Sequence, residues 1–202
     1  MARYTGPKQR LQRRIGEDLG LKTNALKTAK RINVRPGQHG HKRTRRPSDY
    51  GMQLMAKQRV KYIYGILEKQ LKKAYALATK SSQGTGQALL VNLERRLDNV
   101  VYRLGWAPTR AAARQLVAHN HVQVSKKKMN IPSYQVKEND VIALKKKATN
   151  IPAVAAVMSD ESFAVPQWLE RKHNVAKVVR FPERDEVSEK IEEQLIVEFY
   201  SR

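Results

Sequence analysis

The clearest hydrophobic pattern in the chain lies near its middle and has the spacing of an amphipathic helix. A stripe over 93–106 consists of Leu93, Leu97, Val100, Val101 and Leu104. Residues at this spacing share one face of a helix, so the pattern predicts a helix that needs a core to cover it. Ala107 and Pro108 break this helix, and Thr109 is placed to cap a second one over 110–119.

Beyond residue 119 the hydrophobic spacing changes from that of a helix to that of a strand. Residues 121–124 alternate as in a strand, and 125–128 predict a turn that contains three lysines. Further short strands are expected at Met129, Ile131, Val136 and 141–144. The middle of the chain is therefore expected to fold as two helices on a small sheet, with a basic exposed side.

Helices are also predicted on both sides of this region. Ser48 is placed to cap a long helix that continues to about Lys80, whose buried stripe is Val60, Ile63, Leu67, Leu71, Ala74 and Ala78. A shorter terminal helix follows a cap at Ser188, with Ile191, Leu195 and Phe199 as its apolar positions. Between them a short helix over 153–158 and a strand over 176–181 are expected, and Trp168 is read as a core or lid residue.

Residues 1–47 have a different character, because they hold fourteen basic side chains and few aliphatic ones. Hydrophobic burial alone would scarcely offset the entropy of ordering such a segment. Ile15, Leu19 and Leu21 form a small apolar cluster, and phosphate contacts are expected to hold the rest. The alternative is a solvated basic tail.

The charge of the whole chain points to a polyanionic partner. Lys and Arg total 40 against 18 Asp and Glu, a net charge of +22 over 202 residues. With 41% hydrophobic residues this is a folded protein with basic surfaces and not a disordered tail. The last quarter, 151–202, differs in carrying seven basic and ten acidic residues, which suggests a different neighbour there.

The same composition disfavours several classes of protein. There is no cysteine, so disulfides and thiolate zinc sites are excluded. The N-terminus lacks an apolar signal-peptide core and no apolar run is long enough to span a bilayer, so a cytosolic protein without membrane partners is expected. The basic residues are also spread over several segments, unlike those of one membrane-binding amphipathic helix.

No convincing catalytic set can be assembled from the sequence. The histidines are His39, His41, His119, His121 and His173. The two His-x-His pairs could be read as metal ligands, but without nearby cysteines or paired carboxylates RNA contact is favoured. Neither a metal, a cofactor nor a small-molecule substrate is expected, and the chain is not expected to be an enzyme.

Two motifs in the middle region carry a resemblance to a known family. Residues 96–103 and 109–117 closely resemble the RNA-binding module named after the small-subunit ribosomal protein S-four. That module also occurs in pseudouridine synthases, tyrosyl-tRNA synthetases and a heat-shock RNA-binding protein. By itself the module therefore indicates RNA binding, but it does not identify the class of protein.

The flanking segments extend the resemblance to the whole chain. Residues 3–8, 36–40 and 47–54 resemble the N-terminal region of the bacterial S-four ribosomal protein family, and 168–170, 182–184 and 193–198 resemble its C-terminal pattern. Some members hold the N-terminal region with four zinc-ligating cysteines, which this sequence lacks. The chain is thus similar to a cysteine-free variant of that family.

The resemblance implies an α+β protein in which an RNA-binding module is inserted into a helical domain. The expected division is a basic arm at 1–47, a helical domain at 48–92 completed by 183–202, and the S-four-type module at 93–182. It also implies a structural component of the small ribosomal subunit that binds a helical junction in the 5′ domain of the ribosomal RNA early in assembly. Contact with the neighbouring S-five protein and an influence on decoding accuracy belong to the same expectation.

The expected binding residues follow from charge and position. On the arm and the long helix they are Arg3, Lys8, Arg10, Arg13, Arg14, Lys22, Lys30, Arg31, Arg35, His39, His41, Lys42, Arg43, Arg45, Arg46, Lys57, Arg59 and Lys61. On the module they are Arg103, Arg110, Arg114, Gln115, His119, Asn120, Lys126, Lys127 and Lys128. Phosphate contact is favoured over a solvated face on the long helix, because acids that would form i,i+4 pairs are nearly absent. The expected contacts to a neighbouring protein are Tyr50, Gln53, Glu198 and Tyr200.

Two other functions remain open at this point. One is a stand-alone RNA chaperone or ribosome-rescue factor that uses the same module, which moderate salt should release from ribosomes. The other is a non-catalytic remnant of an RNA-modifying enzyme, although the residues before the module leave no room for a catalytic domain.

Overall fold

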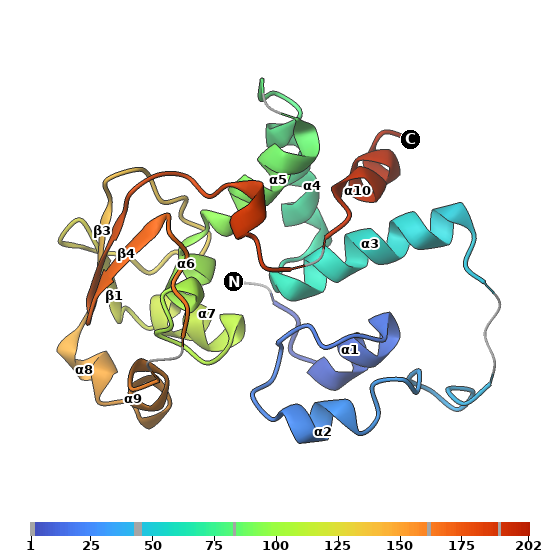
Figure 1. Ribbon diagram of the computed structural model, residues 1–202, viewed down its shortest axis with the longest axis horizontal. Helices are drawn as coiled ribbons and strands as arrows, with labels where there is room; N and C mark the ends of the chain where they lie inside the picture. Colours follow the sequence, from blue (N-terminus) through green and yellow to red (C-terminus); the bar gives the residue numbers. More distant parts are fainter. Residues whose placement is uncertain (1–2, 43–45, 83, 161–162, 190) are drawn as a thin grey trace. The chain divides into compact units, whose positions relative to one another are not determined.

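The computed structural model describes residues 3–42, 46–82, 84–160, 163–189 and 191–202. The chain divides into two compact units (Figure 1), one formed by 1–88 with 189–202 and the other by 89–188. The first unit is helical and the second is α+β, which confirms the fold class expected from the sequence. No helix in the described part of the chain is long and apolar enough to cross a bilayer.

The first unit consists of short helices. They are α1 (Lys8–Ile15), α2 (Ala25–Ala29), α3 (Asp49–Ile63), α4 (Glu68–Ala78), the start of α5 (Thr85–Glu94), and α10 (Glu193–Tyr200). Ser48 caps α3 as expected, since its hydroxyl accepts a hydrogen bond from the backbone N–H of Gly51 at 3.3 Å. The expected cap at Ser188 is wrong, because α10 begins only at Glu193.

The single long helix predicted from Ser48 to Lys80 is two helices. Gly65 has a φ of +62°, in the left-handed region where glycine commonly ends a helix. Leu67 is then extended, and α4 starts at Glu68. The apolar spacing continues across the break, so periodicity alone did not reveal it.

Helix α10 packs on α3 within this unit (Figure 1). Ile196 is fully buried, while Phe199 lies beside two α3 side chains. Its ring centroid is 5.8 Å from that of Tyr50 and 4.5 Å from the Lys57 ammonium. The terminal helix therefore completes the core of the N-terminal helices by long-range contacts.

The second unit contains α6 (Leu97–Arg103), α7 (Arg110–Ala118) and an antiparallel sheet in the order β2-β1-β3-β5-β4. The strands are β1 (Val122–Val124), β2 (Lys127–Lys128), β3 (Val141–Leu144), β4 (Leu169–Lys172) and β5 (Val175–Val178). Two short helices, α8 (Lys146–Thr149) and α9 (Pro152–Met158), and a 3₁₀ turn at Arg184–Glu186 complete it. In the hairpin of β4 and β5, the sequence predicted the second strand but not the first.

The predicted helix over 93–106 is interrupted. Helix α5 ends at Glu94 and α6 begins at Leu97, while Arg96 pairs with Gln135 in an isolated β-bridge. The backbone N–H of Val136 donates to the Arg95 carbonyl at 2.9 Å. The five apolar residues of the stripe are nonetheless all buried, so the pattern identified the core while tertiary backbone pairing set the helix boundaries.

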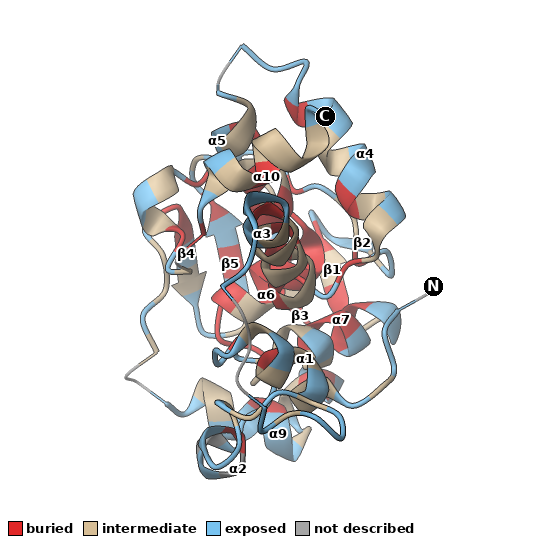
Figure 2. Ribbon diagram, turned by 90° about the vertical axis from the view of Figure 1, so that its right-hand side faces the viewer, coloured by how far each residue is buried: buried red, intermediate tan, exposed pale blue. Residues whose placement is uncertain are grey.

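One core fills the space between the α6–α7 pair and the sheet. Alternate strand residues point into it, including Val122, Val124, Ile142, Leu144, Ala176 and Val178. Trp106 and Trp168 are also in this core, with exposed fractions of 0% and 1%. Figure 2 shows α6 as mainly buried, whereas buried and exposed positions are mixed along the strands of this unit.

Candidate nucleic-acid interface

A buried ion-pair cluster joins the start of α6 to α7. The Asp98 carboxylate accepts hydrogen bonds from Arg96 Nε and Nη2 at 3.1 and 2.7 Å, and from Arg114 Nη1 at 3.0 Å. Its Oδ1 also accepts from the backbone N–H of Asn99 at 3.0 Å. All three charged side chains are at most 9% exposed. Two arginines thus share one carboxylate in a place where an unpaired charge would be very costly.

A second buried cluster surrounds Glu94. Arg103 binds it through Nε at 3.0 Å and Nη2 at 2.8 Å, a bidentate arrangement. Asn99 Nδ2 donates to the same carboxylate at 2.7 Å. Arg103 Nη1 donates in addition to the Ser188 hydroxyl at 2.8 Å, so the cluster reaches the last residues of this unit.

These clusters correct part of the predicted interface. Arg103 and Arg114 were expected to contact phosphate, but each is only 8% exposed and ion-paired within the chain. Their contacts make them internal ties between the end of α5, α6 and α7. The available signal was the presence of Glu94 and Asp98 beside a strongly apolar stripe, since acids at such positions are rarely buried without a partner.

Arg110 differs because its guanidinium is only partly buried. Its Nε donates to Asn99 Oδ1 at 2.8 Å, and its guanidinium carbon lies 4.5 Å from the centroid of the Tyr102 ring. A planar guanidinium held by a hydrogen bond and an aromatic face loses little further entropy on binding an anion. The buried Glu94 cluster therefore orients Arg110 through Asn99, at the N-terminal start of α7.

Replacing Arg110 with lysine is expected to weaken RNA binding about tenfold, since lysine has no planar fork to orient. The urea midpoint of this unit, followed by tryptophan fluorescence, should change little because the buried clusters are intact. Unchanged RNA affinity in a filter-binding titration would contradict the role given to Arg110.

The remaining predicted residues of this unit lie on its surface. Gln115, His119 and the three lysines at the β1–β2 turn, Lys126, Lys127 and Lys128, are exposed, and Asn120 is half-buried. Only Lys126 lies in the turn itself, because Lys127 and Lys128, predicted as part of it, form β2. The turn is tight, with positive φ at Ser125 and Lys126. The sequence interpretation missed Lys146 and Lys147, exposed on α8, which follows the pairing of the Lys145 N–H with the His121 carbonyl at 2.9 Å.

Most predicted cations of the arm are solvent-exposed. They are Arg3, Arg10, Arg14, Lys22, Lys30, Arg31, Arg35, Lys42 and Arg46, together with His39 and His41. Lys8 and Arg13 are half-buried. Burial is the main cause that lowers the pKa of Lys8, and the nearby charges of Lys22 and Arg3 lower it further. Arg43 and Arg45 lie outside the described residues.

The three predicted cations of α3 are engaged within the chain. Lys57 is buried and donates to Glu68 Oε1 at 2.9 Å, Lys61 donates to Oε2 at 3.3 Å, and Arg59 is ion-paired with Glu17. Burial withdraws Lys57 from a phosphate-binding face, whereas Arg59 and Lys61 keep partly exposed side chains, and their contact with phosphate stays a prediction. The acids that pair with these cations lie in the arm and on α4. The sequence interpretation looked only for acids four residues away on the same helix and therefore missed them.

Glu68 also receives a hydrogen bond from the Tyr200 hydroxyl at 2.8 Å. Burial alone would raise the pKa of Glu68, but the hydrogen bonds from Lys57, Tyr200 and Lys61 and the Lys57 charge hold it below its ordinary value. Its contribution to stability is therefore present at neutral pH and is lost as the pH falls below 4.5 through the lowered value.

The four residues expected to bind a neighbouring protein also have contacts within this unit, and their role toward a partner stays a prediction. Gln53 Nε2 donates to Glu198 Oε2 at 2.9 Å, and Tyr200 binds Glu68. Gln53 is only 7% exposed, whereas Tyr50 is 50% exposed. Of the four, Tyr50 offers the largest free surface to another molecule.

Replacing Tyr200 with phenylalanine is expected to cost about 1 kcal/mol at pH 8, because it removes a hydrogen bond to a half-exposed carboxylate. Burial, followed by the bond to Glu68, raises the pKa of Tyr200 above its ordinary 10.0. The stabilisation is complete below that pH and declines as the unfolded chain ionises above it. Urea unfolding followed by far-UV circular dichroism should thus show a smaller difference at pH 10.5 than at pH 8, and an equal difference would contradict this.

Among the described residues, no three His, Asp or Glu side chains converge in a metal-binding cluster. The His119 and His121 rings lie 6.4 Å apart between centroids. The chemistry available on these surfaces is that of exposed guanidinium and ammonium groups, amides and imidazoles, which suits binding to phosphate and sugar.

Comparison with known proteins agrees with this chemistry. Residues 3–94 match the family described as the ribosomal protein S4/S9 N-terminal domain, and 95–142 match the S4 domain. The chain is 47% identical over 204 residues to the small ribosomal subunit protein uS4 of Parabacteroides distasonis, and 45% over 204 to that of Phocaeicola vulgatus. It is 46% identical over 209 residues to that of Natranaerobius thermophilus, and each of these matches covers 100% of both chains.

Proposed function

Because this chain belongs to the family of the small ribosomal subunit protein uS4, we propose that it is a structural component of that subunit and binds its ribosomal RNA directly. Its role is to clamp folded RNA and not to catalyse a reaction. It then resides on ribosomes, in the cytoplasm of a bacterium or in an organelle of bacterial descent.

The observation that carries the proposal is the similarity to these relatives over the full length of the chain. The location of the exposed cationic side chains supports it. Many cations are exposed on the arm, at the β1–β2 turn and on α8, and further exposed lysines lie on α4 and on β4 and β5. Several other cations are neutralised by buried or half-buried acids. A surface of many separate exposed cations suits an RNA recognised through its backbone and shape.

Sucrose-gradient fractionation tests this function. A structural component should sediment with the small subunit and stay in the particle after a high-salt wash. A stand-alone chaperone or rescue factor should instead be released by moderate salt, and that outcome would reject the proposal.

We further infer that the RNA bound is a helical junction in the 5′ domain, engaged early in assembly, and that the S-five protein is a neighbour with a shared influence on decoding accuracy. The residue best exposed for a protein contact is Tyr50. If Tyr50→Ala leaves crosslinking to S-five within assembled subunits unchanged, that contact lies elsewhere.

A further inference from the structure

The solvent side of α4 carries a row of four lysines, here called the α4 stripe, which consists of Lys69, Lys72, Lys73 and Lys80. All four are exposed. Residues three, four and eleven positions apart lie on the same side of an α-helix. Lys80 follows the last residue of α4, but its backbone N–H still donates to the Leu77 carbonyl at 3.3 Å, so it continues the row. With a rise of about 1.5 Å per residue, the stripe is about 16 Å long.

The opposite side of α4 is fixed in the core of the first unit. Leu71 and Ala78 are fully buried. The Tyr75 ring lies 4.8 Å from the Tyr200 ring of α10, measured between centroids. Figure 2 accordingly shows buried and exposed positions mixed along α4. These contacts fix the rotation of the helix about its axis, so the stripe is held toward solvent.

The one acid of α4, Glu68, is engaged on another side of the helix. Its carboxylate accepts hydrogen bonds from Lys57 and Lys61 of α3 and from Tyr200 of α10. No lysine of the α4 stripe has an ion pair or a side-chain hydrogen bond among the described residues. The charge of the stripe is therefore not compensated by the acid of its own helix.

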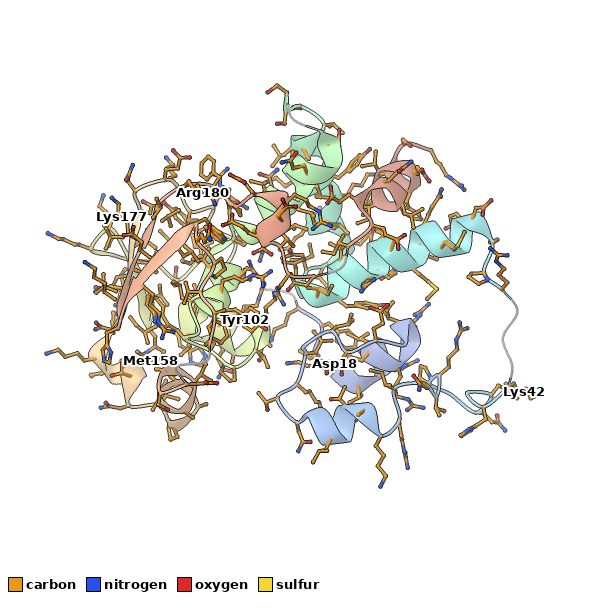
Figure 3. The ribbon with its side chains drawn as sticks, in the orientation of Figure 1. Asp18, Lys42, Tyr102, Met158, Lys177 and Arg180 are labelled. Atoms are coloured by element: carbon orange, nitrogen blue, oxygen red, sulfur yellow. The ribbon has the colours of Figure 1, made fainter. Side chains whose placement is uncertain are left out.

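Two cations labelled in Figure 3 show a different situation. Lys177 on β5 lies directly across from Glu170 on β4, and Arg180 donates to Glu186 at 2.9 Å. Each has an acid beside it. In the α4 stripe, by contrast, lysines four residues apart repel each other, which destabilises a helix. An anionic partner would offset this repulsion.

The composition of the stripe selects among anionic partners. A membrane surface needs an apolar helix face to insert, and that face of α4 is used in the core. The centres of protein–protein interfaces are depleted in lysine. Single-stranded RNA is bound with aromatic side chains that stack on its bases, and the stripe contains none. A straight row of ammonium groups instead suits the phosphates of double-helical RNA, which proteins recognise through backbone and shape.

We propose that the α4 stripe binds the phosphate backbone of a double-helical segment of the bound RNA, in addition to the arm, the β1–β2 turn and α8. This rests on the proposed function, because it names a further surface of the chain for that RNA and the form of RNA that the surface takes.

Filter binding to a transcript of small-subunit ribosomal RNA tests the contribution of these charges. In the full-length chain, changing all four lysines to glutamine should reduce the magnitude of the log–log salt slope by about three to four, because each lysine on a phosphate contributes close to one. Changing the same four to arginine keeps the charge and should keep the wild-type slope. Both residues suit a helix about as well as lysine, so both variants should retain the wild-type far-UV circular dichroism.

A second measurement identifies the RNA beside the stripe. The sequence has no cysteine, so Ala76→Cys gives a single attachment point for an iron–EDTA group, at an exposed position within the stripe. Hydroxyl radicals generated there should cut both strands of one RNA helix. The wild-type protein, treated in the same way, has no attachment point and should give no such cuts.

An unchanged salt slope in the glutamine variant would overturn the proposal. Cuts confined to unpaired nucleotides would also overturn it, as would the absence of cuts when the Ala76→Cys chain is bound to the RNA. Failure of the wild-type protein to bind the transcript at any salt concentration would instead reject the proposed function.

Discussion

Replacing Asp98 with asparagine is expected to lower the free energy of unfolding of the second unit by about 3–5 kcal/mol. The carboxylate is the shared partner of Arg96 and Arg114, and all three groups are nearly inaccessible to water. Asparagine would remove the negative charge that Arg96 and Arg114 share and would turn an amide donor toward their guanidinium groups. This is the largest stability effect we expect from one substitution in the chain.

Urea unfolding followed by tryptophan fluorescence measures this loss in the full-length chain. The sequence has two tryptophans, Trp106 and Trp168, and both lie in the core of this unit, so the signal reports on it selectively. Glu170→Gln, on an exposed strand residue, is the matched control and should change stability by about 0.5 kcal/mol or less.

A double variant separates charge burial from a simple packing defect. Adding Arg114→Met to Asp98→Asn removes one of the two cations that lose the Asp98 charge, so it should restore part of the lost stability. Fully additive losses would show that the shared carboxylate is not what couples α6 to α7.

Binding of ribosomal RNA is expected to weaken steeply with salt. A log–log slope equivalent to at least about six neutralised phosphates corresponds to a loss of about a thousandfold between roughly 50 and 200 mM salt. We expect the exposed cations of the arm, the β1–β2 turn and α8 to supply these contacts. A wild-type slope equivalent to one or two phosphates would contradict this distribution of binding charge.

The turn between β1 and β2 allows the contribution of one surface to be isolated. Changing Lys126, Lys127 and Lys128 together to glutamine should reduce the magnitude of the slope by about two to three, because each exposed lysine on phosphate contributes close to one. The corresponding triple change to arginine keeps the charge and should leave the slope unchanged. An unchanged slope in the glutamine variant would show that RNA does not reach this turn.

The structure contains several elements that the sequence predicts, and it also contains two helix breaks that the sequence analysis missed. The apolar stripe of 93–106, the cap at Thr109 and the strand over 141–144 are all present, because local spacing and capping chemistry decide them. The breaks at Gly65 and at Arg96 were missed, since one depends on a left-handed glycine and the other on a β-bridge to a residue far along the chain.

The sequence by itself determined the basic charge that suits a polyanion, which family module the chain uses and the buried stripe of 93–106, because net charge, motif and periodicity are properties of the linear chain. In the terminal helix the buried residue is Ile196, whereas the predicted positions Leu195 and Phe199 are only partly buried. Only the tertiary structure decided which cations are available to RNA. Lys57 and Arg59 are neutralised by Glu68 and Glu17, and Arg114 by Asp98, acids from other elements of the same unit. Electrostatic partners are chosen by distance through space, and folding brings together charges that the sequence keeps apart.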